Sequence, residues 1–159
     1  MCSSKPEFRL GRKVFILMAF SHFVVTLVDR TMTWVYEKSD GRLGSRLGNI
    51  GMLALHTTGR TSGEKRSHTL QYMPDGARYV IVASNNGQDR HPGWYHNLLS
   101  NPHVCIQIGR RRQAALATVA GPEEYAQLWP RLIAQNPPWE AYARRTTRKI
   151  PVVILHPLA

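Results

Sequence analysis

The chain contains the stretch Thr57-Thr58-Gly59-Arg60-Thr61-Ser62-Gly63-Glu64-Lys65-Arg66. An apolar run precedes it and an alternating run follows it, so the pattern predicts a strand, a tight turn and a second strand. Its two glycines let the backbone come close to a ligand, and successive turn amides can form an anion-binding nest. Arginine adds planar donors for a phosphate or a carboxylate. The stretch is therefore interpreted either as an anion cradle, with a cofactor phosphate as its ligand, or as an ordinary polar hairpin turn.

The composition points to a folded, strongly basic chain. It has 159 residues, of which 43% are hydrophobic, and this suits one domain with a substantial core. Lysine and arginine number 21 against 10 acidic residues, which gives a formal net charge of +11. Such an excess favours an anionic partner: nucleic acid, an anionic membrane surface or a polyanionic small molecule. The densest basic groups, Arg110–Arg112 and Arg144–Lys149, are more typical of solvated faces than of sites.

The segment Arg12–Tyr36 is predicted to be helical, with an apolar run from Val14 to Val28 and basic residues before it. No small-residue cleavage site follows, and the run is shorter than the roughly 20 residues of a membrane span. It is expected either to pack on the domain or a partner subunit, or to lie in a membrane interface. We divide the chain into this N-terminal segment, residues 1–40, and one domain, residues 41–159.

Six short strands, mostly in hairpins, are predicted after a glycine-rich connector at residues 41–48. The strands are expected at Gly51–Thr58, Lys65–Met73, Ala77–Ser84, His103–Ile108, Gln113–Val119 and Ile150–His156, with turns at Pro74-Asp75-Gly76 and at Gly109 with the arginines. Helices are expected at Pro92–Ser100, from Pro122 to the break at Asn136-Pro137-Pro138, and at Trp139–Thr147. This order predicts the α+β class: a small closed or split β-barrel with flanking helices and an N-terminal apolar helix.

A second stretch with the character of a site is His91-Pro92-Gly93-Trp94-Tyr95-His96-Asn97-Leu98, after a polar loop from Ser84 to His91. Proline and glycine leave the amides of a helix start accessible, and Trp94 supplies a flat apolar wall, so these parts suit the edge of an aromatic ring. The alternative is a helix whose Trp94, Tyr95 and Leu98 only anchor it to the barrel.

Other classes of chemistry receive little support. Cys2 and Cys105 lack the spacing of a metal site or a CxxC motif, so a reduced cytoplasmic setting is expected. His91 and His96 are five residues apart and do not share a helix face, so no metal is expected. There is no GxSxG motif, no suitable Cys–His pair and no carboxylate cluster, so an enzyme of this sequence is expected to rely on a bound cofactor.

Three motifs together resemble the deazaflavin-dependent nitroreductase and quinone reductase family over roughly residues 41–157. The first is Thr57-Thr58-Gly59-Arg60-x-Ser62-Gly63. The second is His91-Pro92-x-Trp94-Tyr95-x-Asn97-Leu98-x-x-Asn101-Pro102. The third is the tail Leu128-Trp129-Pro130…Tyr142…Thr146…Ile150-Pro151-Val152-Val153. They occur in order and with matching spacing, which makes the combination specific.

The resemblance implies a split β-barrel like those of flavin-binding oxidases, with the deazaflavin coenzyme F420 as hydride donor. The phosphate and oligoglutamate tail of this cofactor would explain the basic surplus better than nucleic acid does. Carried over by position, the residues expected around the phosphate and tail are Arg60, Thr61, Ser62, Gly63 and Arg66, with Lys65 alongside. Pro92, Gly93 and Trp94 are expected to line the ring, with Asn97 nearby, and Asn85 stands where relatives often have a lysine.

The same resemblance places the acceptor pocket at Ser84, Asn136, Trp139 and Tyr142. Nitroreductase relatives carry tyrosines at the positions of Asn136 and Trp139, so a quinone is expected ahead of a bulky nitroaromatic acceptor. Ser84 or Tyr142 is expected to orient the acceptor by donating a hydrogen bond to the oxygen that gains charge. A homodimer is expected by resemblance, and the apolar N-terminal segment would suit peripheral contact with the inner face of the cell membrane.

Two alternatives remain open. A split-barrel enzyme with flavin mononucleotide (FMN) would also hold a phosphate with arginine, serine and threonine, although the Gly-Arg-x-Ser-Gly and Pro-x-Trp-Tyr motifs favour the deazaflavin. A non-enzymatic basic module for nucleic acid or anionic lipid would fit the net charge and Arg110–Arg112. The aromatic residues are not interleaved with the basic runs as a stacking surface requires, so no nucleic-acid partner is expected.

Overall fold

The computed structural model describes residues 31–48 and 50–158. Residues 31–38 are helical. The strands are β1 (Arg46–Leu47), β2 (Ile50–Thr58), β3 (Lys65–Asp75), β4 (Arg78–Val82), β5 (His103–Ile108), β6 (Arg111–Val119) and β7 (Val152–Pro157). The helices are α2 (Gly93–Ser100), α3 (Pro122–Gln135) and α4 (Pro138–Arg145), with a 3-10 turn, η1, at Asn85–Gly87.

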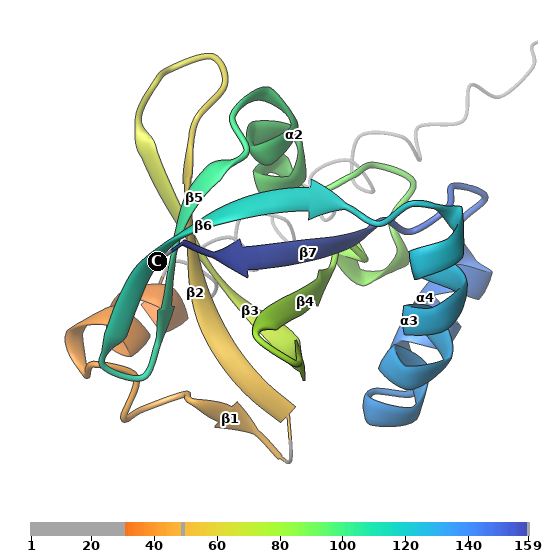
Figure 1. The fold of residues 1–159 in the computed structure, drawn as a ribbon, viewed down its shortest axis with the longest axis horizontal. Helices are drawn as coiled ribbons and strands as arrows, with labels where there is room; N and C mark the ends of the chain where they lie inside the picture. Colours follow the sequence, from red (N-terminus) through yellow and green to blue (C-terminus); the bar gives the residue numbers. More distant parts are fainter. Residues whose placement is uncertain (1–30, 49, 159) are drawn as a thin grey trace, which may run out of the picture.

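Six strands form a closed antiparallel barrel in the order β2-β3-β4-β7-β6-β5 (Figure 1). The pairing of β5 with β2, at which Leu55 lies opposite Ile106, closes it. β1 joins the sheet only through β2. Closure removes the free edges that an open sheet of these strands would present. The expected α+β split β-barrel is therefore confirmed.

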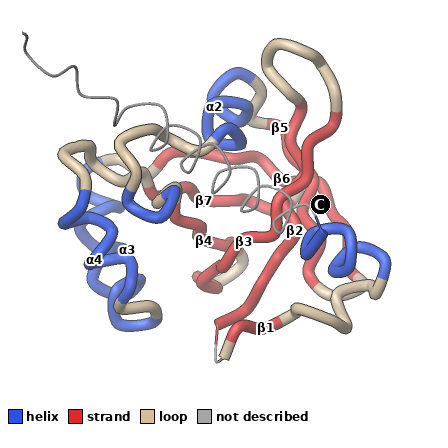
Figure 2. The backbone as a smooth tube through the Cα atoms, turned by 180° about the vertical axis from the view of Figure 1, so that it is seen from behind, coloured by secondary structure: helices blue, strands red, loops and turns tan. Residues whose placement is uncertain are grey.

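Alternate residues of β4 and β7 belong to two separate cores, which explains the continuous apolar runs Val80–Val82 and Val152–Leu155 in these strands. Ile81 and Val153 pack inside the barrel with one face of α2, whereas Val80 and Ile154 pack with α3 and α4. Leu128 and Leu132 of α3 are buried in this second core, whose other members are Met73, Val82, Trp139, Ile150 and Val152. Figure 2 shows α3 and α4 side by side, on the opposite flank of the barrel from residues 31–38.

The turn between β3 and β4 was predicted two residues too early. β3 continues through Pro74 and Asp75, so the turn consists of Gly76 and Ala77. Proline cannot donate to a strand ladder, which argued for placing it in the turn. However, the pairing of β3 with β2 ends at Tyr72, so Pro74 lies where its strand is free on that side. The predicted hairpin is thus present with Gly76 in its turn, but Pro74 and Asp75 belong to β3 and not to the turn.

Other strand and helix boundaries also differ from those predicted. The connector at residues 41–48 contains β1, a two-residue strand too short to leave a pattern. β6 begins at Arg111, because Arg111 and Arg112 pair with β5, so Gly109 and Arg110 alone make that turn. β4 ends at Val82 rather than Ser84, and the polar loop after it contains η1. α4 ends at Arg145 rather than Thr147.

Residues 31–38 are the described end of the predicted helix Arg12–Tyr36; the remainder lies outside the described residues. The Tyr36 hydroxyl is 3.0 Å from the Met52 carbonyl oxygen and accepts a hydrogen bond from the Gly109 amide at 3.1 Å. Burial raises the pKa of Tyr36, so the hydroxyl keeps the proton that it donates to Met52. Within residues 31–48 and 50–158, no helix has both the length and the apolar character needed to cross a membrane.

Candidate functional site

The turn between β2 and β3 is closed by its own backbone. The Gly59 amide donates to the Glu64 carbonyl at 2.7 Å, and the Gly63 amide donates to the Gly59 carbonyl at 2.8 Å. Gly63 has a φ of +68°, which glycine adopts without strain. In the described chain the amides of Thr61 and Ser62 make no hydrogen bond, so two successive N–H groups remain available to an anion.

Three cations surround this turn, and we name the stretch Gly59–Arg66 the cradle. Arg60 and Lys65 are exposed and form no ion pair within the described part of the chain. Arg66 lies 2.6 Å from a Glu64 carboxylate oxygen, but both side chains are at least half exposed, so this pair is weak and can exchange for a ligand. The cradle therefore combines positive charge with free backbone donors, which is the geometry that an anion requires.

Helix α2 is fastened to the cradle by the buried amide of Asn97. Its Oδ1 accepts a hydrogen bond from the Arg60 backbone amide at 3.2 Å, and its Nδ2 donates to the Thr57 hydroxyl at 3.1 Å. The cradle accordingly rises beside α2 (Figure 1). The structure thus directs the amide of Asn97, predicted to lie near the ring of a cofactor, toward the backbone of the cradle.

A groove of about 490 Å³ opens at the start of α2 and is lined by Asn85, Gln88, Asp89, Arg90, His91, Pro92, Gly93 and His96. A side chain at Gly93 would meet no atom within 4 Å, so the space over the first turn of α2 is open. Pro92, Gly93 and Asn85, which were predicted as cofactor contacts, thus lie along one groove. Trp94 does not line this groove: its side chain is 4% exposed and packs in the barrel core with Leu98. The burial of Trp94 favours the anchoring interpretation of this residue, and its contact with a cofactor ring stays a prediction.

The four predicted acceptor residues gather around one cavity of about 680 Å³. Ser84, Asn136, Trp139 and Tyr142 all line it, together with Gly48, Ile50, Met52, Thr69, Leu70, Gln71, Val82, Asn86 and Pro138. The hydroxyls of Ser84 and Tyr142 make no hydrogen bond to the described protein, whereas the Asn136 amide donates to Gln71 at 2.7 Å. A largely apolar wall with two unpaired hydroxyls suits a flat, mostly apolar ligand with polar oxygens.

The groove and the cavity share one border, the loop Ser84–His91, which we name the dividing loop. The loop is held by Arg148, which in the sequence belongs to a basic group that is typical of a solvated face. Arg148 donates to the Ser84 carbonyl at 2.7 Å and contacts His91 Nδ1 at 3.1 Å. Arg148 and His91 are 57 residues apart in the sequence, so no local sequence pattern could have predicted their contact.

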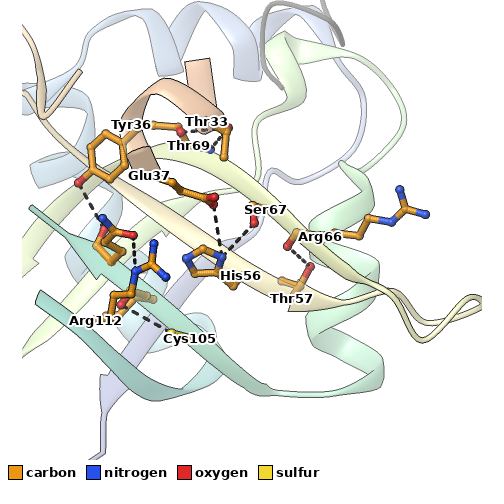
Figure 3. A network of polar contacts seen from close by, with 12 residues as sticks. Thr33, Tyr36, Glu37, His56, Thr57, Arg66, Ser67, Thr69, Cys105 and Arg112 are labelled. Atoms are coloured by element: carbon orange, nitrogen blue, oxygen red, sulfur yellow. Dashed lines mark hydrogen bonds and ion pairs between the residues drawn. The ribbon is translucent and has the colours of Figure 1, made fainter. Parts of the chain in front are cut away.

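A second polar cluster lies on the outside of the barrel, under residues 31–38 (Figure 3). His56 Nδ1 is 2.9 Å from the Ser67 hydroxyl and 3.5 Å from a Glu37 carboxylate oxygen. Catalysis by a Ser–His–acid set requires the serine and the acid to contact different ring nitrogens. Here both contact Nδ1, and Nε2 is buried with no hydrogen-bond partner in the described chain. Burial also lowers the pKa of His56 despite the neighbouring Glu37, so the cluster is structural.

The described residues contain no group of three or more His, Cys, Asp or Glu side chains placed to hold a metal ion. The chemistry-bearing features are therefore the cradle, the groove and the cavity. This arrangement can bind an elongated anionic molecule along the cradle and groove, next to an apolar molecule in the cavity. It supplies orientation and a sheltered volume, and the reactive group has to come from a bound molecule.

Comparison with known proteins identifies the family to which this fold and sequence correspond. A family model for the F420H(2)-dependent quinone reductases matches residues 27–157. An F420H(2)-dependent quinone reductase of Mycobacterium tuberculosis is 42% identical over 125 residues, which cover 76% of this chain and 84% of the relative.

Solved structures show the same barrel. An F420-H2 dependent reductase matches with a TM-score of 0.61 and 34% identity, covering 65% of this chain and 92% of that one. A chain described as a domain-swapped dimer matches with a TM-score of 0.65 and 30% identity, covering 85% of this chain and 98% of that one. The extent of the family match, together with the identity to curated relatives, shows that this chain belongs to the F420H2-dependent quinone reductase family.

Proposed function

We propose that the protein is an oxidoreductase that transfers a hydride from reduced coenzyme F420 to a quinone. Membership of the family supports both the cofactor and the reaction. The observation that carries the proposal to this chain is that Ser84, from the dividing loop, and Asn136, Trp139 and Tyr142, from α4 and the residues before it, line one cavity. That cavity borders the groove across the dividing loop, so a donor and an acceptor can lie next to each other.

The residues present fit an elongated cofactor that carries negative charge. Arg60, Lys65 and Arg66, with the free amides of the cradle, would hold the phosphate and the acidic tail. Pro92 and Gly93 would hold the edge of the ring over the open start of α2. Asn85 adds no charge there, because its side chain is a neutral amide, and this amide donates to the Arg90 carbonyl at 2.9 Å.

When bound, F420H2 supplies the hydride, and the quinone takes up one hydride and one proton to become a hydroquinone. The chain's own contribution is orientation and exclusion of water by the apolar wall of the cavity. The unpaired hydroxyls of Ser84 and Tyr142 would donate hydrogen bonds to the quinone oxygen on which negative charge develops. Because Asn136 is already bonded to Gln71 and Trp139 is buried, a bulky nitroaromatic acceptor is expected to react more slowly than a quinone.

The direct test is anaerobic mixing of the purified protein with F420H2 and menadione, following reoxidation of the cofactor against a protein-free control. Wild-type protein should accelerate reoxidation, and Tyr142→Phe should slow turnover by about tenfold if its hydroxyl stabilises the oxygen. Arg110→Ala removes an exposed charge at the other end of β5, outside the groove and the cavity, and serves as the matched control. Turnover with FMN but not with F420 would overturn the cofactor assignment.

The location of the protein is a separate question, because many quinones are soluble in lipid. We propose that the protein is cytoplasmic and makes a peripheral contact with the inner face of the cell membrane. The support is the apolar run Val14–Val28 with its preceding basic residues, which would bring the enzyme to a lipid-soluble quinone. Vesicles with anionic lipid should retain the full chain and release a variant without residues 1–30. Equal retention of both proteins would contradict this placement.

A homodimer is the proposed assembly, supported by the relative of 30% identity that forms a domain-swapped dimer. Light scattering coupled to size-exclusion chromatography measures the mass in solution. The proposal predicts twice the mass of the 18.0 kDa chain, and a monomer at micromolar concentration would contradict it.

A further inference from the structure

The dividing loop has an unusual backbone. Asn85, Asn86 and Gly87 follow one another with φ values of 47°, 54° and 75°. Single asparagine or glycine residues adopt this left-handed conformation readily, but a run of three is costly unless the surroundings enforce it. Such strain persists where neighbouring structure fixes the chain, and it is concentrated at functional sites. The dividing loop therefore needs an external restraint.

Arg148 supplies that restraint from the segment between α4 and β7. Its Nε donates to the Gln88 carbonyl at 2.8 Å, and its Nη2 donates to the Ser84 and Ala83 carbonyls at 2.7 and 3.2 Å. These acceptors lie on both sides of the left-handed run. A planar guanidinium can reach them together because its five N–H groups point in different directions within one rigid plane. A lysine ammonium cannot reproduce this arrangement.

The remaining arm of Arg148 fixes the chemistry of His91. Nη1 of Arg148 lies 3.1 Å from His91 Nδ1. A guanidinium has donors only, so Nδ1 must carry the lone pair, and the ring is neutral with its proton on Nε2. Burial, followed by the positive charge of Arg148 and by the neighbouring His96, lowers the pKa of His91 and so favours the same neutral state. His91 thus enters the wall of the groove as a neutral hydrogen-bond donor.

The position of the loop gives this restraint a role in the reaction. Ser84 and Asn86 line the acceptor cavity, whereas Asn85 and His91 line the cofactor groove. A shift of the loop would move both walls at once. The guanidinium of Arg148 is occupied by protein acceptors, so it is not available to a phosphate as Arg60 and Lys65 are.

We propose that Arg148 is a positioning residue for hydride transfer: it fixes the dividing loop between the groove and the cavity and holds His91 as the neutral tautomer with its proton on Nε2. The role in catalysis rests on the proposed function, whereas the state of His91 can be measured without it. A displacement of about 1 Å in such a wall can lower kcat/KM by as much as about 100-fold.

The experiment compares Arg148→Met and Arg148→Lys with Arg144→Met. Arg144 lies in α4, is 73% exposed and pairs only with Glu140 in the described chain, so its loss controls for one missing charge nearby. Long-range proton–nitrogen NMR on cofactor-free protein labelled at histidine reports which nitrogen of His91 is protonated. Steady-state assays with F420H2 and menadione report kcat and both KM values per folded molecule.

In wild type and in Arg144→Met, His91 should show one tautomer, protonated on Nε2. In Arg148→Met the tautomers should mix, kcat should fall by about 10- to 100-fold, and the quinone KM should rise. Arg148→Lys should fold but should not restore kcat. A merely structural role would lower the folded fraction and leave kcat per folded molecule unchanged.

Wild-type kcat per folded molecule and an unchanged His91 spectrum in both Arg148 variants would overturn the proposal. If Arg148→Met does not fold, Arg148→Lys decides. If wild-type protein does not oxidise F420H2 at all, the proposed function fails, and the NMR comparison still decides whether Arg148 fixes His91.

Discussion

The cradle and the dividing loop both turn polar groups toward a ligand, but they are held in opposite ways. The cradle closes on its own backbone, and within the described chain the side chains of Arg60 and Lys65 form no ion pair. The dividing loop contains a left-handed run and depends on Arg148, whose donors are all directed at protein atoms. In a chain with a net charge of +11, an arginine near a site can therefore serve either the ligand or the loop that shapes the site.

The largest difference between the two loops should appear in the free energy of unfolding when one glycine in each loop is replaced by alanine. Gly87→Ala should destabilise the protein by about 3 kcal/mol, because φ is +75° and the new Cβ would lie 2.9 Å from the Tyr142 carbonyl oxygen. Gly63→Ala in the cradle has a similar φ of +68° but meets no atom within 4 Å, so about 1 kcal/mol is expected. Urea unfolding measures both values. Equal losses would show that the dividing loop can move away from α4.

The second difference concerns the cofactor. Arg60→Ala should weaken F420 binding by about tenfold, since a charge-assisted contact is lost, while leaving the unfolding free energy nearly unchanged. Fluorescence titration at low and high salt measures the affinity. The difference between wild type and variant should shrink as salt screens the exposed charge. An unchanged affinity at low salt would remove Arg60 from the cofactor site.

The third and smallest difference is a pH effect. Burial, followed by the charge of Arg148 and by His96, lowers the pKa of His91 below its ordinary value of about 6.5. The folded state therefore favours neutral His91, so this contribution is fully present above about pH 6.5 and is lost as the pH falls below it. Hydrogen exchange should show the dividing loop opening in mild acid before the cradle, whose turn contains no histidine.

His91→Gln is the control for the pH effect. Its amide oxygen can accept the hydrogen bond from Arg148 but does not titrate in this range. The variant should keep the dividing loop closed at the lower pH. Opening of the loop in mild acid to the same extent as in wild type would assign the effect to another group.

The features that could be predicted from sequence are those whose parts are adjacent in the chain. The cradle places its glycines, hydroxyls and cations within eight residues, between an apolar run in β2 and an alternating run in β3. The groove start at Pro92-Gly93 has the same local character. The acceptor residues came from family resemblance, because their convergence depends on how α3 and α4 pack on the barrel.

The features that were missed depend on distant contacts. Nothing near Arg148 in the sequence distinguishes it from the exposed Arg144, because its acceptors lie 57 to 65 residues away. Trp94 could equally have faced a ligand or the core until the rotation of α2 was known. Pro74 is accepted in β3 only because β2 stops pairing at Tyr72.

The most direct test of the account is a stopped-flow measurement of single-turnover hydride transfer to menadione at increasing concentrations of F420H2. Wild type, Arg60→Ala and Arg148→Met are compared under anaerobic conditions. The account predicts that Arg60→Ala reaches a nearly normal limiting rate at higher concentrations of F420H2, whereas Arg148→Met keeps a reduced limiting rate even at saturating F420H2. Identical behaviour of the two variants, or no transfer by wild type, would contradict the assignment of binding to the cradle and positioning to the dividing loop.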